Sequence, residues 1–108
     1  MALIRVNMGV CEYTHMVRVT LREDGLLDVN IESECDKVRE YGEQLGTLSM
    51  ADLGSITLSR IMDPMIVEHL TPTCMAPLAV FNAAWMETGL MSRSLAIKTG
   101  QIGMEFLE

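Results

Sequence analysis

The stretch MVRVTLREDGLLDVNIE, residues 16–32, shows the clearest structural pattern in this chain of 108 residues. In its second half, Leu27, Val29 and Ile31 alternate with polar residues, which is typical of a β-strand with one buried face. The Asp-Gly pair at 24–25 favours a tight turn between antiparallel strands, and apolar residues are frequent on both of its sides. The stretch therefore predicts a β-hairpin.

Outside the hairpin, the N-terminal residues add a strand and the middle of the chain adds helices. Residues 2–8 alternate between apolar and polar, and we expect Leu3 and either Val6 or Met8 to face inward. Helical patterns occupy residues 35–46, 49–62, 63–70 and 74–89, whereas residues 92–108 predict a short strand and a terminal tail. We expect one α+β domain over residues 1–108, with a three-stranded, mainly antiparallel N-terminal sheet and helices packed on one face.

End signals support the helix boundaries. Asp63 is suited to an N-cap and Pro64 to the first helical position after it. Ser49 and Asp52 have the spacing of a capping box. Gly89 predicts the end of the longest helix, because glycine accepts the backbone conformation that stops a helix.

The charge balance excludes several classes of partner. Eight Lys and Arg against fifteen Asp and Glu give a net charge of -7, which repels nucleic acids and anionic lipid surfaces.

No apolar run approaches the roughly 18 residues that a membrane span needs, and we find no signal-peptide pattern at the N-terminus. We therefore expect a cytoplasmic protein, in which three cysteines would be free thiols, metal ligands or redox groups.

Each cysteine lies at a junction between predicted elements. Cys11 falls in the loop between the first two strands, Cys35 where the third strand meets a helix, and Cys74 at the start of the longest helix. A helix N-terminus carries partial positive charge, which would lower the thiol pKa of Cys35 and Cys74 and favour the thiolate. A single cysteine is more often a small buried hydrophobe, but three at turns favour one shared metal or iron–sulfur site.

Three thiolates leave a tetrahedral metal ion one ligand short. His69, five residues before Cys74, is the predicted fourth ligand, and His15, four residues after Cys11, is an alternative. An oxygen from Asp36 or Glu12, or a water molecule, would also complete the set. Neither histidine has the spacing of a known ligand motif, so the fourth ligand stays open.

This layout resembles the iron–sulfur cluster assembly scaffold family, the NifU-like N-terminal domain. The resemblance rests on MGVCEY with Cys11, IESECDKV with Cys35 and LTPTCMAPLAVFNAAW with Cys74, and it extends over about residues 2–87. It implies an IscU-like fold in which these three cysteines hold a labile cluster. The chain is also similar to the TSCPD-type metal-binding domain, through GVC at residues 9–11 and TPTCMAP around Cys74.

The sequence departs from both patterns. Tyr13 stands where the scaffold family usually has an aspartate, Thr73 where it has a histidine, and Glu34 where it has a glycine. TSCPD-type domains have a further cysteine shortly before the last one, and His69 is the nearest candidate here. The resemblance therefore implies a metal site with an incomplete ligand set, for which zinc is an alternative to a cluster.

Two other functions compete with a metal-binding scaffold or carrier. A small interaction module would keep the cysteines in its core and use its ten methionines for core packing or as an adaptable contact surface, with protein partners or as a homodimer. A thiol enzyme would use Cys74 as nucleophile with His69 or His15 as base, but no catalytic motif supports an enzyme.

Overall fold

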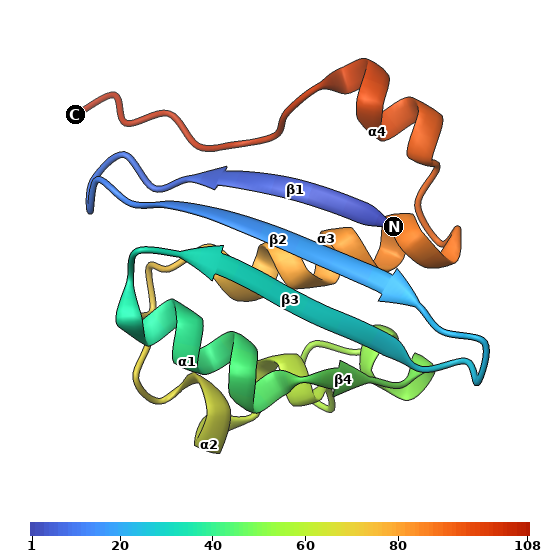
Figure 1. Ribbon diagram of the computed structural model, residues 1–108. Coiled ribbons are helices and arrows are strands. Elements are labelled where there is room, and N and C mark those ends of the chain that lie inside the picture. The colour runs from blue at the N-terminus through green and yellow to red at the C-terminus, as the bar shows by residue number, and fades with distance from the viewer.

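The computed structural model describes all 108 residues and shows a four-stranded antiparallel sheet with the strand order β1-β2-β3-β4 (Figure 1). The strands are β1 (Ala2–Asn7), β2 (Thr14–Leu21), β3 (Leu27–Ser33) and β4 (Thr47–Leu48). The helices are α1 (Asp36–Leu45), α2 (Pro64–Val67), α3 (Ala76–Thr88) and α4 (Arg93–Thr99), with 3-10 turns η1 (Met50–Leu53) and η2 (Arg60–Met62). None of the helices is long and apolar enough to cross a bilayer.

The α+β class, the hairpin and the antiparallel sheet are confirmed, but the sheet has four strands instead of the predicted three. The extra strand β4 is only two residues long and pairs Leu48 with Leu27 and Thr47 with Asp28. Two residues are too few to show a period in the sequence. They become a strand because α1 returns the chain to the free edge of β3.

One face of the sheet is buried, and the register explains which residues share it. Val17 lies opposite Ile31 and Val19 opposite Val29, so the alternating apolar residues of the hairpin point to the same side. In β1, Ala2 and Val6 are on this buried face, whereas Leu3 is 40 % exposed on the other. The expectation that Leu3 faces inward is therefore wrong, because β1 has apolar residues on both faces.

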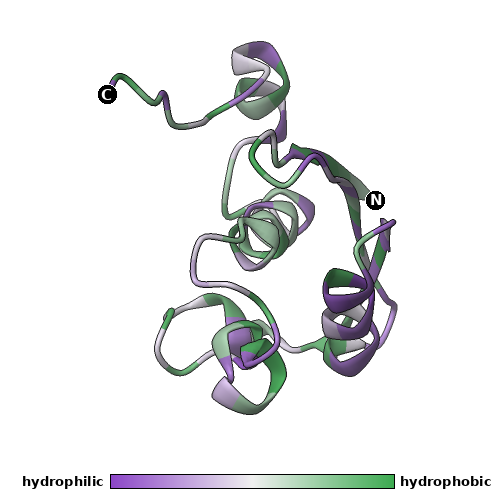
Figure 2. Ribbon diagram, turned by 90° about the vertical axis from the view of Figure 1, so that its left-hand side faces the viewer, coloured by the Kyte–Doolittle hydropathy of each residue, from purple (hydrophilic) through white to green (hydrophobic).

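Helices α1 and α3 cover the buried face (Figure 2). Helix α3 lies against β1 and β2 through a side of small residues, which allows a close approach; they are Ala76, Ala79, Val80, Ala83 and Ala84. Helix α1 packs on β3, where Gly42 sits against Ile31. The apolar stripe of α3 formed by Leu78, Phe81 and Trp85 lies on its outer side, so it is not the core-facing side.

The end signals of two helices are confirmed. The Asp63 carboxylate accepts the Met65 N–H at 2.9 Å at the start of α2, and Gly89 ends α3 with a left-handed φ of 80°. The Ser49 capping box closes only the single turn η1, so residues 49–62 form short 3-10 turns and not a longer helix.

The C-terminal expectation is partly wrong. Residues 93–99 form helix α4 instead of a strand, because the Ser92 hydroxyl caps the helix by accepting the Leu95 N–H at 3.2 Å. Residues 100–108 have no regular structure and are exposed. The methionines are mostly outside the core as well, since Met86 alone among the ten is buried.

Candidate thiol site

The three cysteines come from three separate segments that meet at one end of the sheet. Strands β1 and β3 end there and β2 begins there, so the loop with Cys11 and the junction with Cys35 are neighbours (Figure 1). Helix α3 starts at the same end, two residues after Cys74. The predicted placement of all three cysteines at element junctions is therefore confirmed.

The three thiols differ in exposure, and all are free. Cys11 is exposed, whereas Cys35 and Cys74 are half-buried. Cys11 sits in a tight turn in which its N–H donates to the Met8 carbonyl at 2.8 Å and the Met8 N–H donates to the Tyr13 carbonyl at 3.0 Å. Glu12 in this turn has a left-handed φ of 63°, which costs a non-glycine residue conformational energy.

The thiols influence one another electrostatically. Burial raises the pKa of Cys74, and negative charge on Cys35 and Cys11 raises it further. A hydrogen bond from the Ala76 N–H at the start of α3 lowers the pKa of Cys74, as expected for a helix N-terminus, but the effect of burial is larger. The expectation of a lowered pKa is therefore wrong for Cys74, because burial and neighbouring thiolates both oppose the charged form.

A buried histidine lies at the same end. His15 is 1 % exposed on the inner face of β2, and its Nδ1 lies 2.6 Å from the Ser33 hydroxyl oxygen. The same Ser33 oxygen accepts the Cys35 N–H at 2.9 Å. Ser33 therefore ties the imidazole to the backbone of a candidate ligand. Burial lowers the pKa of His15, so the ring is neutral at physiological pH.

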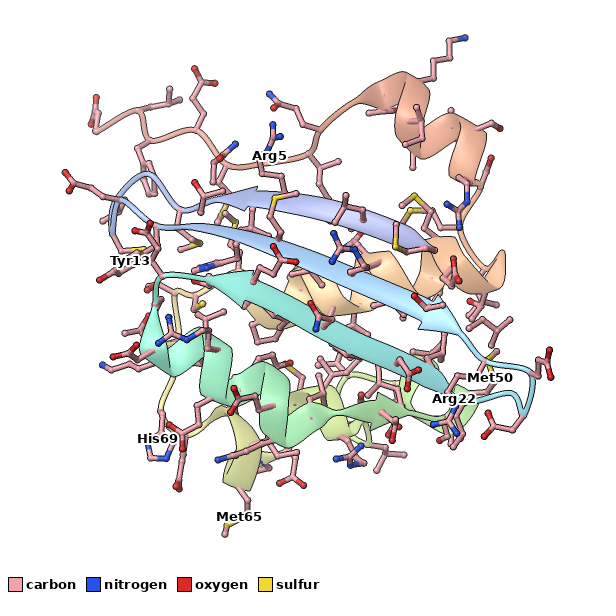
Figure 3. All side chains as sticks on the ribbon, in the orientation of Figure 1. Arg5, Tyr13, Arg22, Met50, Met65 and His69 are labelled. Carbon is pink, nitrogen blue, oxygen red and sulfur yellow. The ribbon has the colours of Figure 1, made fainter.

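The other proposed ligands point elsewhere. The His69 ring is exposed, and its Nε2 lies 3.4 Å from the Glu68 carboxylate. Figure 3 shows His69 directed outward below α1, away from the loop that carries Tyr13. Asp36 forms an ion pair with Arg39 on the surface of α1.

The three thiols lie at the same end of the sheet, but they do not form a complete metal coordination sphere. No three His, Cys, Asp or Glu side chains form a group close enough to hold a metal ion. Cys11, the exposed member, is on a loop, whereas Cys35 and Cys74 are fixed at helix starts.

Two further features next to Cys74 are not evident from the sequence. Buried Tyr41 donates its hydroxyl to the Ile61 carbonyl at 2.9 Å, and burial together with the Cys74 charge raises the pKa of Tyr41. An open pocket of about 500 Å³ has Cys74 in its wall and is otherwise mainly apolar; its other lining residues include Val67, Leu70, Pro77, Leu78 and Phe81. The thiol site therefore has an apolar, accessible side.

Comparison with known proteins places the chain in a family without assigning an activity. The model of a family of unknown function, DUF6951, matches residues 2–99. No curated protein matches the chain. No solved structure matches it either.

Proposed function

The chain belongs to the DUF6951 family, whose function is unknown, and we propose from its thiol site that it binds a thiophilic metal ion or an iron–sulfur cluster through Cys11, Cys35 and Cys74. One observation carries the proposal: three cysteines far apart in the sequence lie on three junctions that meet at one end of the sheet. The raised pKa of Cys74, to which charge on Cys35 and Cys11 contributes, agrees with this arrangement. A reducing cytoplasm, which we expect for this protein, would keep these thiols available.

The electrostatics of the site favour a cation. Three thiolates held together repel one another, and burial at Cys74 adds a desolvation cost. A bound cation removes both penalties, because the metal displaces the thiol protons and neutralises the sulfur charges. Thiolate sulfur is also the donor type that zinc and iron–sulfur clusters prefer in proteins.

The donor chemistry fits such a group, but the present spacing requires one movement. Since no three ligating side chains are within coordinating distance, the exposed turn with Cys11 has to close on Cys35 and Cys74. That turn includes the left-handed Glu12 and has solvent on its outer side. A site completed by a loop at the surface suits a carrier or scaffold, which must release its cargo, as the resemblance to the scaffold family implies.

His15 is better suited than His69 to be the fourth ligand. Its ring is buried at the thiol end, Nδ1 is oriented by Ser33, and Nε2 has no hydrogen-bond partner within the protein. A ligating imidazole commonly has its second nitrogen held in this way. His69 would need the segment after α2 to turn inward from solvent, although it remains the ligand predicted from the sequence.

Anaerobic purification followed by metal and sulfide analysis tests the proposal. We expect either about one zinc per chain or iron with acid-labile sulfide and visible thiolate-to-iron absorption. Substituting Cys11, Cys35 or Cys74 by serine should each abolish or strongly weaken uptake. Bound metal should also protect all three thiols of the wild type from alkylation, which is a readout independent of any activity.

Two histidine variants serve as a matched pair in the same experiment. His15→Gln should weaken the affinity for the metal by about 10- to 100-fold, so that dialysis against a chelator removes the metal more readily. His69→Gln should leave the affinity unchanged. A wild-type protein that takes up neither zinc nor a cluster, and keeps three freely alkylated thiols after reconstitution, would contradict the proposal.

A further inference from the structure

The turn with Cys11 and the junction with Cys35 leave neighbouring strands at the same end of the sheet (Figure 1). The pairing of β2 with β3 stops there at His15 and Ser33. Cys11 lies four residues before His15 along the chain, and Cys35 lies two residues after Ser33. Because neighbouring strands are about 4.8 Å apart, the two segments with the thiols begin side by side.

Cys35 is held in place, whereas the Cys11 turn is not tied to the rest of the domain. The Cys35 N–H donates to the Ser33 hydroxyl at 2.9 Å, and the Cys35 carbonyl accepts the Arg39 N–H at 3.0 Å in the first turn of α1. Cys11 is exposed, and its hydrogen bond to the Met8 carbonyl stays within the turn. A disulfide needs its Cα atoms about 4.4–6.8 Å apart, so any approach that this requires falls to the Cys11 turn.

Cys74 is less suited than Cys35 to react with Cys11. A thiolate is the form that attacks an oxidised sulfur, and burial raises the pKa of Cys74, so little of its thiolate is present at neutral pH. The accessible side of Cys74 also opens into the apolar pocket beside α2 and α3, whose wall includes neither Cys11 nor Cys35.

We propose that hydrogen peroxide converts Cys11 and Cys35 into a disulfide within one chain, while Cys74 stays a free thiol. The exposed Cys11 thiolate attacks one peroxide oxygen, the O–O bond breaks, and Cys11 becomes a sulfenic acid as hydroxide leaves. The Cys35 thiolate then attacks the Cys11 sulfur, so that the S–S bond forms and the S–O bond breaks, which releases a second hydroxide. The two thiol protons convert both hydroxides to water, and two electrons pass from the thiols to one peroxide.

The disulfide competes with the metal site of the proposed function but does not rest on it. It occupies two of the three candidate ligands, so the oxidised chain has one thiolate left for a metal ion. A bound metal ion would in turn shield the thiols from peroxide. In a reducing cytoplasm such a disulfide is transient, because cellular thiols reduce it again. The metal-free protein therefore tests the disulfide alone.

Peroxide treatment of the dilute, metal-free full chain, followed by alkylation and tryptic mapping, tests the proposal. Cleavage after Lys and Arg places the cysteines in separate peptides, residues 6–18, 23–37 and 61–93. We expect peptides 6–18 and 23–37 to be linked and Cys74 to be alkylated, so the chain loses two of its three alkylatable thiols. Reduction with dithiothreitol should restore all three.

Single substitutions identify the role of each thiol. Cys74→Ser should form the same linked pair as the wild type. Cys11→Ser should keep both remaining thiols alkylatable after peroxide treatment. Cys35→Ser should leave a sulfenic acid on Cys11, which dimedone traps.

The outcomes separate this proposal from metal binding. A link that includes Cys74, links between two chains only, oxidation of Cys11 without a link, or three alkylatable thiols after treatment would overturn the disulfide, and none of these results concerns metal uptake. If the wild type takes up no metal but peptides 6–18 and 23–37 are linked, the metal site fails and the disulfide stands.

Discussion

His15 Nδ1 lies 2.6 Å from the Ser33 hydroxyl oxygen, across the β2–β3 pair at the thiol end of the sheet. The same oxygen accepts the Cys35 N–H, so one hydroxyl serves a buried imidazole and the start of α1. His15 is the residue that orients toward the helix layer at this end, as Val17 and Val19 do further along β2. The Ser33 hydroxyl therefore links the packing of His15 at this end of the sheet to the position of Cys35.

Ser33→Ala should destabilise the fold. It removes the partner of a buried ring nitrogen and the acceptor of the Cys35 N–H, and we expect a loss of about 1–3 kcal/mol in the free energy of unfolding by urea. Ser94→Ala, in exposed helix α4, is the control and should be neutral or slightly stabilising. Equal stability of Ser33→Ala and wild type would mean that the hydroxyl bridge contributes nothing.

His15 should make stability depend on pH in the mildly acidic range. Because burial lowers its pKa in the folded state, the unfolded chain binds the proton at higher pH than the folded chain does. The contribution of neutral His15 is therefore present above about pH 6.5 and is lost as the pH falls below that value. Urea unfolding between about pH 7 and pH 5 should show a flatter profile for His15→Gln than for the wild type.

His69→Gln is the matched control for that profile. Its ring is exposed, so its substitution should leave the slope unchanged. If the two variants have the same slope as the wild type, the burial of a neutral His15 is not what couples stability to pH.

The thiols should react with iodoacetamide in the order of their exposure and charge. Cys11 is exposed and should be alkylated first, whereas Cys74, whose pKa is raised by burial, should be last at neutral pH because little thiolate is present. Removing a neighbouring thiolate relieves repulsion, so Cys35→Ser and Cys11→Ser should both lower the pKa of Cys74 and speed its alkylation. Mass spectrometry of the labelled peptides over a pH series measures both effects.

A Cys74 that is alkylated fastest at neutral pH would contradict this order and would favour the thiol-enzyme reading. The pKa shift also explains why that reading is weaker. A nucleophilic cysteine needs a stabilised thiolate, and the environment of Cys74 opposes it unless a cation is bound.

Local patterns were enough to predict the hairpin, the start of α2, the end of α3 and the positions of all three cysteines at junctions, whereas the helix expected over 63–70 stops at Val67. These features depend on neighbouring residues, such as the alternation before Ile31 or the glycine at position 89. The gathering of the junctions at one end follows from the antiparallel order of the strands, which the short hairpin turn already favours.

Features that depend on tertiary packing were not predictable from the sequence. The raised pKa of Cys74 comes from burial and from thiols in other segments, and the role of Ser33 depends on the β2–β3 register that brings His15 beside it. The prediction for β1 placed Leu3 on the inward face because leucine is the larger apolar residue. The inward position belongs to Ala2, since α3 packs too closely on the sheet to leave room for more than alanine. A two-residue strand such as β4 exists only through pairing.

Gly42 should be required for the contact between α1 and β3. A Cβ at this position would lie 3.1 Å from the Cβ, Cγ1 and Cδ1 atoms of Ile31, closer than side chains normally pack. Alanine has the better helix propensity, by about 1 kcal/mol, but overpacking costs about 1–3 kcal/mol. We therefore expect Gly42→Ala to lower the free energy of unfolding by about 1 kcal/mol.

Gly54→Ala and a double variant make the Gly42 measurement specific. A Cβ at Gly54 meets nothing within 4 Å, and its φ of -89° suits alanine, so this substitution should be neutral or stabilising. Adding Ile31→Val to Gly42→Ala removes Cδ1 from the clash and should recover part of the loss, which a double-mutant cycle reports as a coupling. Gly42→Ala with wild-type stability and no coupling to Ile31 would show that α1 does not approach β3 this closely.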